Sequence, residues 1–366
     1  MIKAIRSLIC LMPLLTFICM NTASGEAAAL GEDLYSFQVQ IGDESIALPC
    51  TFEQMKQAGW NYAGNEEELL KPEQRTVSSV WEKNGVLLSG EMVNTSWDVL
   101  PVEECVLAAV ELTSAASPVL LPGGVLIGDS GGREVVDAYG APSSVYEDGE
   151  ISRYTYQLDY DREAVFTFSA STGVLKAASL RNVVMAAAPD PMVLASSAAS
   201  GSSSSYNAPE SLGDDLLSLR VSYGDALYSL PAPVKEFEKH GWVLGEGAGS
   251  VVKAYGSGQL TLSLNGKRWT TWVYNNSDKA ALAGSCLVTA VVSDVKRGDV
   301  SLVLPGGVTT GMAEEEALNA YASLNAKISE TDTCRRYAFS GGGAGIVLSV
   351  QKDSGLICRV EVKNVP

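Results

Sequence analysis

The chain has 366 residues, which is enough for two domains of ordinary size. Its 43 acidic and 26 basic side chains give a formal net charge of −17, and an acidic surface of this kind repels nucleic acid and anionic lipid. Hydrophobic residues make up 46% of the chain, which excludes a protein that is disordered throughout.

Residues 1–25 have the pattern of a secretory signal peptide. Lys3 and Arg6 give a positive start, an apolar run extends from Leu8 to Met20, and small residues follow at 23–25. The run is shorter than the roughly 20 residues that a membrane-spanning helix needs, although an uncleaved anchor is the alternative. We therefore expect a secreted protein, or one associated with the bacterial cell surface, with no membrane insertion after the signal is cleaved.

The rest of the chain consists of two related copies. Leu48-Pro49 followed by Gly59-Trp60 recurs as Leu230-Pro231 followed by Gly241-Trp242, 182 positions later (230 − 48 and 242 − 60). Other landmarks recur in the same order: Asn84-Gly85 with Asn265-Gly266, Cys105 with Cys286, Leu-Pro-Gly-Gly-Val at 121–125 and 304–308, and Tyr154 with Tyr337. We define repeat 1 as residues 34–186 and repeat 2 as residues 213–366. A residue whose counterpart differs is not required by the shared fold.

The segment between the repeats, residues 187–212, has a different composition. It is rich in serine, alanine and proline and shows almost no apolar periodicity. This composition predicts a flexible linker that acts as a spacer.

The two repeats predict the same elements in the same order. In repeat 1, a hairpin turns at Gly42-Asp43, a helix follows Pro49 and stops at Gly59, and a second hairpin turns at Asn84-Gly85. The second half contains a helix through Val135 and Tyr139, followed by a three-stranded β-meander. Helices packed on one face of antiparallel strands define an α+β class, so we expect two tandem α+β domains.

The second half of the repeat also resembles a known family. The pattern consists of Gly128, Glu134-Val135-Val136, Tyr139-Gly140 and Pro142, then Tyr154-x-Tyr156 and Phe166-x-Phe168. It resembles the helix-then-sheet repeat of the SmpA/OmlA lipoproteins and the β-lactamase inhibitory proteins. Repeat 2 departs from it, with Ala322 at the Gly140 position and no matching proline. The resemblance implies a non-catalytic protein that acts through protein–protein contact, and it transfers no binding residue.

The string Gly128-Asp129-Ser130-Gly131-Gly132 resembles the segment around a serine nucleophile and matches the G-x-S-x-G pattern. Its base could only be His240, the single histidine of the chain. Repeat 2 has Ala313 in the corresponding string, so the fold does without the serine. We expect Asp129 or Ser130 to cap the following helix, and we predict no catalytic set, no metal and no cofactor.

Other polar and aromatic candidates also have structural interpretations. Asn94 and Asn275 begin glycosylation sequons at matched positions, which favours a structural turn. Glu147-Asp148 and Asp159 with Asp161 fall in turns, and a weak calcium site at the second pair stays open. Trp97 and Trp269 are candidate platforms for stacking sugars, although Trp269 and Trp272 fall on opposite faces of one strand, so at least one belongs to the core.

Cysteine use separates two groups. Cys105 and Cys286 are equivalent, and each opens an apolar run, which indicates a buried position on a core strand. Cys334 and Cys358 occur only in repeat 2, where repeat 1 has Ile151 and Lys176. Two cysteines gained in one copy predict a local disulfide, with two unpaired thiols as the alternative.

These observations favour an exported, non-catalytic binding protein that contacts another protein. A module that binds envelope glycans through Trp97 and Trp269 is the alternative, and a secreted serine hydrolase that uses Ser130 comes third.

Overall fold

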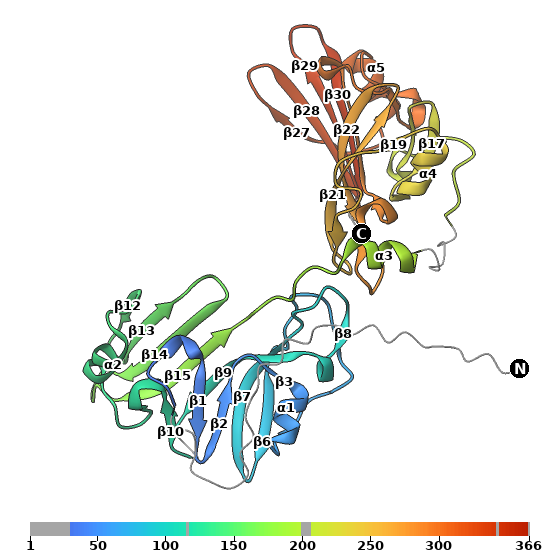
Figure 1. The fold of residues 1–366 in the computed structure, drawn as a ribbon. Coiled ribbons are helices and arrows are strands. Elements are labelled where there is room, and N and C mark those ends of the chain that lie inside the picture. Colours follow the sequence, from blue (N-terminus) through green and yellow to red (C-terminus); the bar gives the residue numbers. More distant parts are fainter. Residues whose placement is uncertain (1–29, 115–116, 199–205, 342–343, 365–366) are drawn as a thin grey trace, which may run out of the picture.

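The computed structural model describes residues 30–114, 117–198, 206–341 and 344–364 (Figure 1). The predicted signal peptide lies outside the described residues.

The protein is β-rich, and the predicted α+β class is wrong. Strands hold 45% of the described chain and helices 17%. The described α-helices are α1 (Phe52–Gln57), α2 (Gly132–Tyr139), α3 (Pro191–Ala198), α4 (Val234–Lys239) and α5 (Glu314–Ala320). The helices that the sequence predicts do form, but none exceeds eight residues, and helices this short cover only a small part of the sheets.

Repeat 1 is organised around one long antiparallel sheet. Its strands are β1 (Gln38–Ile41), β2 (Glu44–Ala47), β3 (Cys50–Thr51), β4 (Asn61–Tyr62), β5 (Leu69–Leu70), β6 (Ser79–Lys83), β7 (Val86–Val93), β8 (Leu100–Pro101), β9 (Val106–Thr113), β10 (Val119–Leu121), β11 (Val125–Leu126), β12 (Ser144–Glu147), β13 (Ile151–Gln157), β14 (Arg162–Ser169) and β15 (Leu175–Asn182). The long sheet has the order β12-β13-β14-β15-β9-β7-β6-β4, with β3 also paired to β9. A smaller sheet has the order β11-β10-β1-β2, and β5 pairs with β8.

Repeat 2 uses the same strands, except that the counterpart of β9 is interrupted and the counterpart of β11 is only an isolated bridge between Val303 and Thr309. They are β16 (Arg220–Tyr223), β17 (Ala226–Ser229), β18 (Ala232–Pro233), β19 (Val243–Leu244), β20 (Val251–Val252), β21 (Ser257–Leu264), β22 (Lys267–Tyr274), β23 (Ala281–Leu282), β24 (Leu287–Val288), β25 (Ala290–Asp294), β26 (Leu302–Val303), β27 (Lys327–Glu330), β28 (Cys334–Gly341), β29 (Ala344–Gln351) and β30 (Leu356–Asn364). The counterpart of β9 is split at Thr289, whose hydroxyl donates to the Trp272 carbonyl. The long sheet is therefore two sheets, β18-β24-β22-β21-β19 and β25-β30-β29-β28-β27.

The predicted hairpin turns form where the sequence places them. Asn84 and Gly85 connect β6 to β7 with φ of 52° and 80°, and Asn265 and Gly266 connect β21 to β22 with φ of 51° and 78°. Two successive positive φ angles define the type I′ turn, which Asn-Gly adopts with little strain and which suits the twist of the flanking strands.

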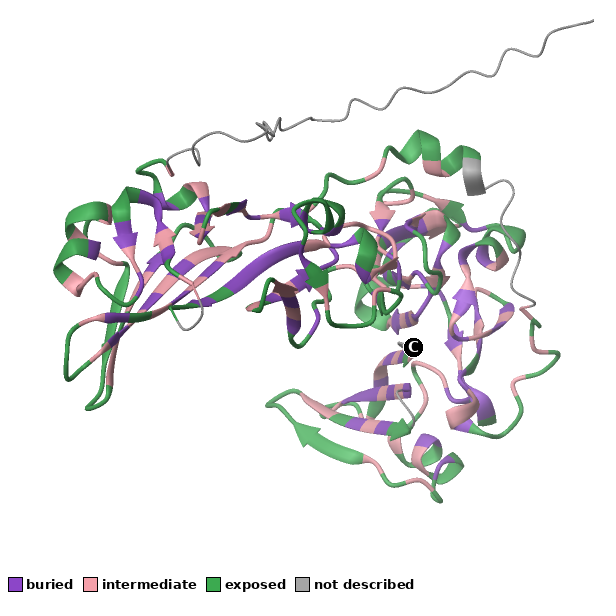
Figure 2. Ribbon diagram, turned by 90° about the horizontal axis from the view of Figure 1, so that it is seen from below, coloured by how far each residue is buried: buried purple, intermediate pink, exposed green. Residues whose placement is uncertain are grey.

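Each repeat has its own hydrophobic core. One cluster of buried residues runs from Leu34 to Leu180 and the other from Leu216 to Val362, and buried positions alternate with exposed ones along the strands (Figure 2). Tyr139 of α2 stacks on Phe166 of β14 with ring centroids 5.6 Å apart. The meander aromatics therefore pack the helix, as their alternation predicts.

The predicted linker is not structureless throughout. Helix α3 lies inside it and rests near β23 of repeat 2 (Figure 1). Asp190 supports the first turn, because its carboxylate accepts the Met192 N–H at 2.8 Å.

Candidate functional site

Ser130 and His240 are not brought together. The Ser130 hydroxyl accepts the Leu126 N–H at 2.9 Å, so it holds the loop before α2. It does not cap the helix, since Gly131 is the N-cap residue and Glu134 folds back to accept its N–H. His240 ends α4 in repeat 2, exposed, with its ring edge against Tyr228.

The two tryptophans that are candidates for stacking on sugars both make contacts within the protein. Trp269 is 7% exposed and packs in the core against Tyr223 and Trp242. The Trp97 indole N–H donates to the Ala186 carbonyl, and the Lys253 ammonium lies 5.2 Å from its ring centroid. Trp269 therefore has no face to offer a sugar, and one face of Trp97 is covered.

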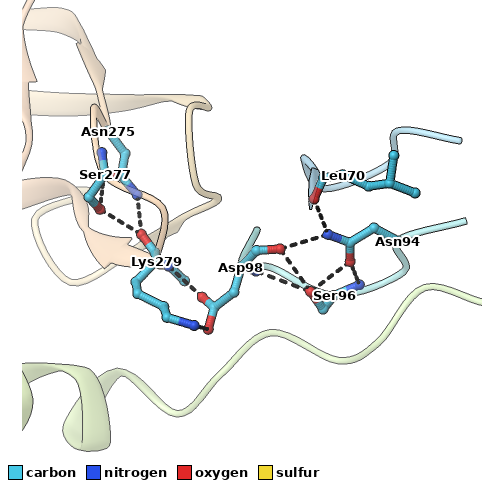
Figure 3. A network of polar contacts seen from close by, with 8 residues as sticks. Leu70, Asn94, Ser96, Asp98, Asn275, Ser277 and Lys279 are labelled. Atoms are coloured by element: carbon cyan, nitrogen blue, oxygen red, sulfur yellow. Dashed lines mark hydrogen bonds and ion pairs between the residues drawn. The ribbon is translucent and has the colours of Figure 1, made fainter. Parts of the chain in front are cut away.

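The two sequon asparagines are buried structural residues. Asn94 donates to the carbonyls of Leu70 and Asp98, both at 2.8 Å, and its oxygen accepts both the N–H and the hydroxyl of Ser96 (Figure 3). Asn275 repeats this arrangement with Ser277. The matched positions predict such a turn.

The two asparagine turns meet at the junction between the repeats. The Asp98 carboxylate accepts the Ala280 N–H at 2.6 Å and pairs with the Lys279 ammonium at 3.5 Å. Lys71 lies over the ring of Tyr255, and Lys253 pairs with Glu73.

The junction contacts are reciprocal in sequence. Lys71 corresponds to Lys253 and Glu73 to Tyr255, each 182 positions apart (253 − 71 and 255 − 73). Each lysine thus reaches the matched position of the other repeat, as in an isologous interface.

Cys334 and Cys358 are thiols that line one open cavity of about 470 Å³. Cys358 donates to the Ser349 carbonyl at 3.3 Å, and its pKa is raised by burial and, to a smaller extent, by the nearby Cys334. Their strands, β28 and β30, flank β29. The predicted disulfide stays a prediction.

Cys105 and Cys286 are buried, as predicted, and donate to the carbonyls of Pro101 and Leu282. Burial raises the pKa of each thiol to about 12.

The acidic pairs differ in their surroundings. Asp159 is tied to Arg162 and accepts the Asp161 N–H at 3.0 Å, so it closes a turn. Glu147 and Asp148, in contrast, line a cavity of about 290 Å³. Backbone hydrogen bonds from Ile151 and Glu150 lower the pKa of Asp148.

This cavity lies beside the start of α2, between the helix and the end of the meander. Its lining is Gly132, Glu147, Asp148, Ile151, Ser152, Tyr154, Phe168, Ser169, Ala170 and Gly173, and no lysine or arginine is among these residues.

The corresponding place in repeat 2 is occupied by an ion cluster. Arg335 donates from Nε to Glu330 at 2.7 Å and from Nη1 to Glu314 at 2.8 Å. Tyr337 donates its hydroxyl to Glu314, and Lys352 pairs with Glu330 at 2.8 Å. The pKa of Glu330 is lowered to about 2 by Lys352 and Arg335.

In each repeat, one sheet also has an exposed strand at its edge. β12 and β27 are terminal in their sheets, and all four residues of each are exposed. Val145 and Tyr146 are 53% and 55% exposed, and Ile328 at the position matching Val145 is 57% exposed. Sequence reasoning missed these strands and the cavity. Aligning the repeats residue by residue would have shown that most of the charged residues of the ion cluster in repeat 2 are absent around the cavity of repeat 1.

Comparison with known proteins finds no relative: no family model, curated protein or solved structure matches this chain. The resemblance to the SmpA/OmlA and β-lactamase inhibitory proteins therefore stays an expectation from sequence. Among the described residues, no helix has the length and apolarity needed to cross a bilayer, and no group of three or more histidine, cysteine or carboxylate side chains could hold a metal ion.

Proposed function

We propose that this protein is an exported, non-catalytic binding protein of the bacterial cell envelope, which captures extended segments of other proteins. The observation that carries the proposal is the pair of matched edge strands, β12 and β27. In the described structure neither has a neighbour on its outer side, so its outward backbone groups can pair with an added strand.

The side chains on these edges fit such a role. Val145 and Tyr146 are exposed on opposite faces of β12. Each can therefore pack against every second side chain of an added strand, on its own face of the sheet. Natural edge strands are normally protected by charge, proline or a bulge, and β12 has only Glu147 at its end. On β27 only Ile328 is apolar, between Lys327 and Glu330, so what recurs in both repeats is one exposed apolar residue at the position of Val145, and this favours a binding use.

Charge favours a different protein over a second copy of this chain. The turn after β12 adds Asp148 to Glu147, and the whole chain carries a net charge of −17. Pairing two such edges would bring like charges together. We therefore infer an extended segment in which apolar residues alternate with basic ones.

Selection from a displayed library of short linear peptides tests the proposal. Binders should be enriched on the full mature chain and should lose affinity with Tyr146→Ala. N-methylation of the peptide at alternate residues should abolish binding in one register and spare it in the other, because only every second N–H of an added strand faces the edge.

The N-methylated peptides leave the protein unchanged, so a folding defect cannot mimic their effect. Equal tolerance of methylation in both registers would rule out strand addition. Binding on a sugar array that is lost with Trp97→Ala would instead favour the glycan alternative.

A further inference from the structure

The cavity of repeat 1 and the ion cluster of repeat 2 occupy the same place in the fold. Glu147 pairs across strands with Ser152, as Glu330 does with Arg335. Ser152 pairs in turn with Phe168, as Arg335 does with Val350.

The adjoining helices correspond as well. Gly132 is the first residue of α2, and Glu314 is the first residue of α5. Since these registers agree, the two sites can be compared residue by residue.

Three side chains that fill the site in repeat 2 are missing in repeat 1. Glu314, Arg335 and Lys352 correspond to Gly132, Ser152 and Ala170. A Cβ atom on Gly132 would lie 3.1 Å from the Tyr154 hydroxyl oxygen, so a side chain at this position would point at the tyrosine, as Glu314 points at Tyr337.

Of the two carboxylates that receive the Arg335 guanidinium, the counterpart of Glu330 is kept, whereas Glu314 is replaced by Gly132. Glu147 stands for Glu330 and Tyr154 for Tyr337, and Asp148 adds a carboxylate where repeat 2 has Thr331. Repeat 1 thus lacks both cations of the cluster and retains acceptors around a cavity of about 290 Å³.

We propose that this cavity binds the guanidinium group of an arginine side chain supplied by a partner protein. Arg335 shows the chemistry within the same chain, because its planar fork spans two carboxylates next to a tyrosine. Lys352 reaches Glu330 alone, so the guanidinium is the group that fills the space.

The inference rests on the proposed function and specifies its ligand. Glu147 is the last residue of β12, so a strand added to that edge carries its side chains past the cavity. An arginine near one end of the captured segment enters it. Repeat 2 supplies its own arginine, and its edge β27 therefore takes segments without this requirement.

Titration of the full mature chain with N-acetyl-L-arginine methylamide, followed by NMR or calorimetry, tests the site. We expect saturable binding, and binding about tenfold weaker for the neutral citrulline analogue, since charge-assisted hydrogen bonds are lost. The Gly132→Glu/Ser152→Arg double variant rebuilds the repeat 2 arrangement and should abolish binding with an unchanged circular dichroism spectrum.

Two single variants provide the matched pair. Glu147→Gln removes a cavity carboxylate and should weaken arginine binding about tenfold. Glu150→Gln removes a neighbouring exposed charge outside the cavity lining and should leave binding unchanged.

Equal binding of arginine and citrulline, or unchanged binding by the double variant, overturns the inference. Equal losses in the two single variants do so too, because they indicate general attraction to an acidic surface. If the arginine probe fails while selected peptides still bind in one methylation register, the cavity inference falls and the proposed function stands.

Discussion

Asn94 uses all of its side-chain hydrogen-bonding capacity within the protein. Both amide hydrogens go to backbone carbonyls, and the oxygen accepts twice from Ser96. The side chain is fully buried and ties β5 to the turn that reaches repeat 2. The asparagine that begins this glycosylation sequon is therefore a buried structural residue.

We expect Asn94→Asp to destabilise repeat 1 by roughly 3 kcal/mol, because a buried carboxylate would face the carbonyl oxygens of Leu70 and Asp98. Asn65→Asp is the control, since Asn65 is exposed and only accepts the Glu67 N–H, and it should change stability by less than about 0.5 kcal/mol. Urea denaturation measures both. Equal stability of the two variants would contradict this account.

Sequence reasoning at the residue scale succeeded where the repeats could be compared. The matched asparagines predicted turns, and both turns form. It gave no sign of the contact between Trp97 and Lys253, which lie 156 positions apart (253 − 97) across the junction. No local pattern encodes that contact.

At the scale of elements, the turns and helices that depend on local sequence could be predicted. The Asn-Gly hairpins formed because their φ requirements are local, and α1 formed with a capping box between Thr51 and Gln54. Fold class depends instead on how much of the chain each kind of element holds, and strands hold 45% of the described chain against 17% for helices. Edge strands escaped notice because pairing order is a tertiary property.

The meander of repeat 2 places Cys334 and Cys358 on the two strands that flank β29. The register shifts between Ser349 and Val350, and this bulge redirects β30 near Cys358. Both thiols line the same cavity, and Cys334 lies close enough to help raise the pKa of Cys358. A bridge would draw β28 and β30 together, because it requires Cα atoms within about 7 Å and the two strands lie two strand spacings apart.

We expect mass mapping of the unreduced protein to yield a peptide that joins Cys334 to Cys358. The bridge would close a loop of about 25 residues and stabilise repeat 2 by roughly 2–4 kcal/mol. Cys105 and Cys286 should resist alkylation in the native protein, since burial keeps their thiols protonated. Alkylation of both Cys334 and Cys358 without reductant would show that no bridge joins them.

On the scale of the whole molecule, the two repeats form separate cores joined by a polar junction. The contacts there are hydrogen bonds, exposed ion pairs and lysine–ring contacts, of which Asp98 with Ala280 and Lys253 with Glu73 are examples. The edges β12 and β27 lie at far ends of the molecule (Figure 1). One short segment therefore cannot occupy both edges, and binding gains from two linked modules only if the partner offers two segments.

The junction should hold only while the chain is intact. Exposed ion pairs contribute about 0–1 kcal/mol each, so the few contacts present sum to an affinity near 1 mM between free repeats. The linker supplies an effective concentration on the order of millimolar, comparable to this Kd, so the junction forms in about half of the intact chains and in very few of the free repeats at micromolar concentration. With a protease site inserted between Gly201 and Ser202, cleavage should release two folded fragments that elute separately at micromolar concentration. In the uncut chain, Asp98→Ala/Lys253→Ala should broaden the size distribution measured by small-angle scattering, whereas Lys235→Ala, at an exposed position of α4, should not. Co-elution of the cut fragments at micromolar concentration would show that the repeats are held by more than these polar contacts.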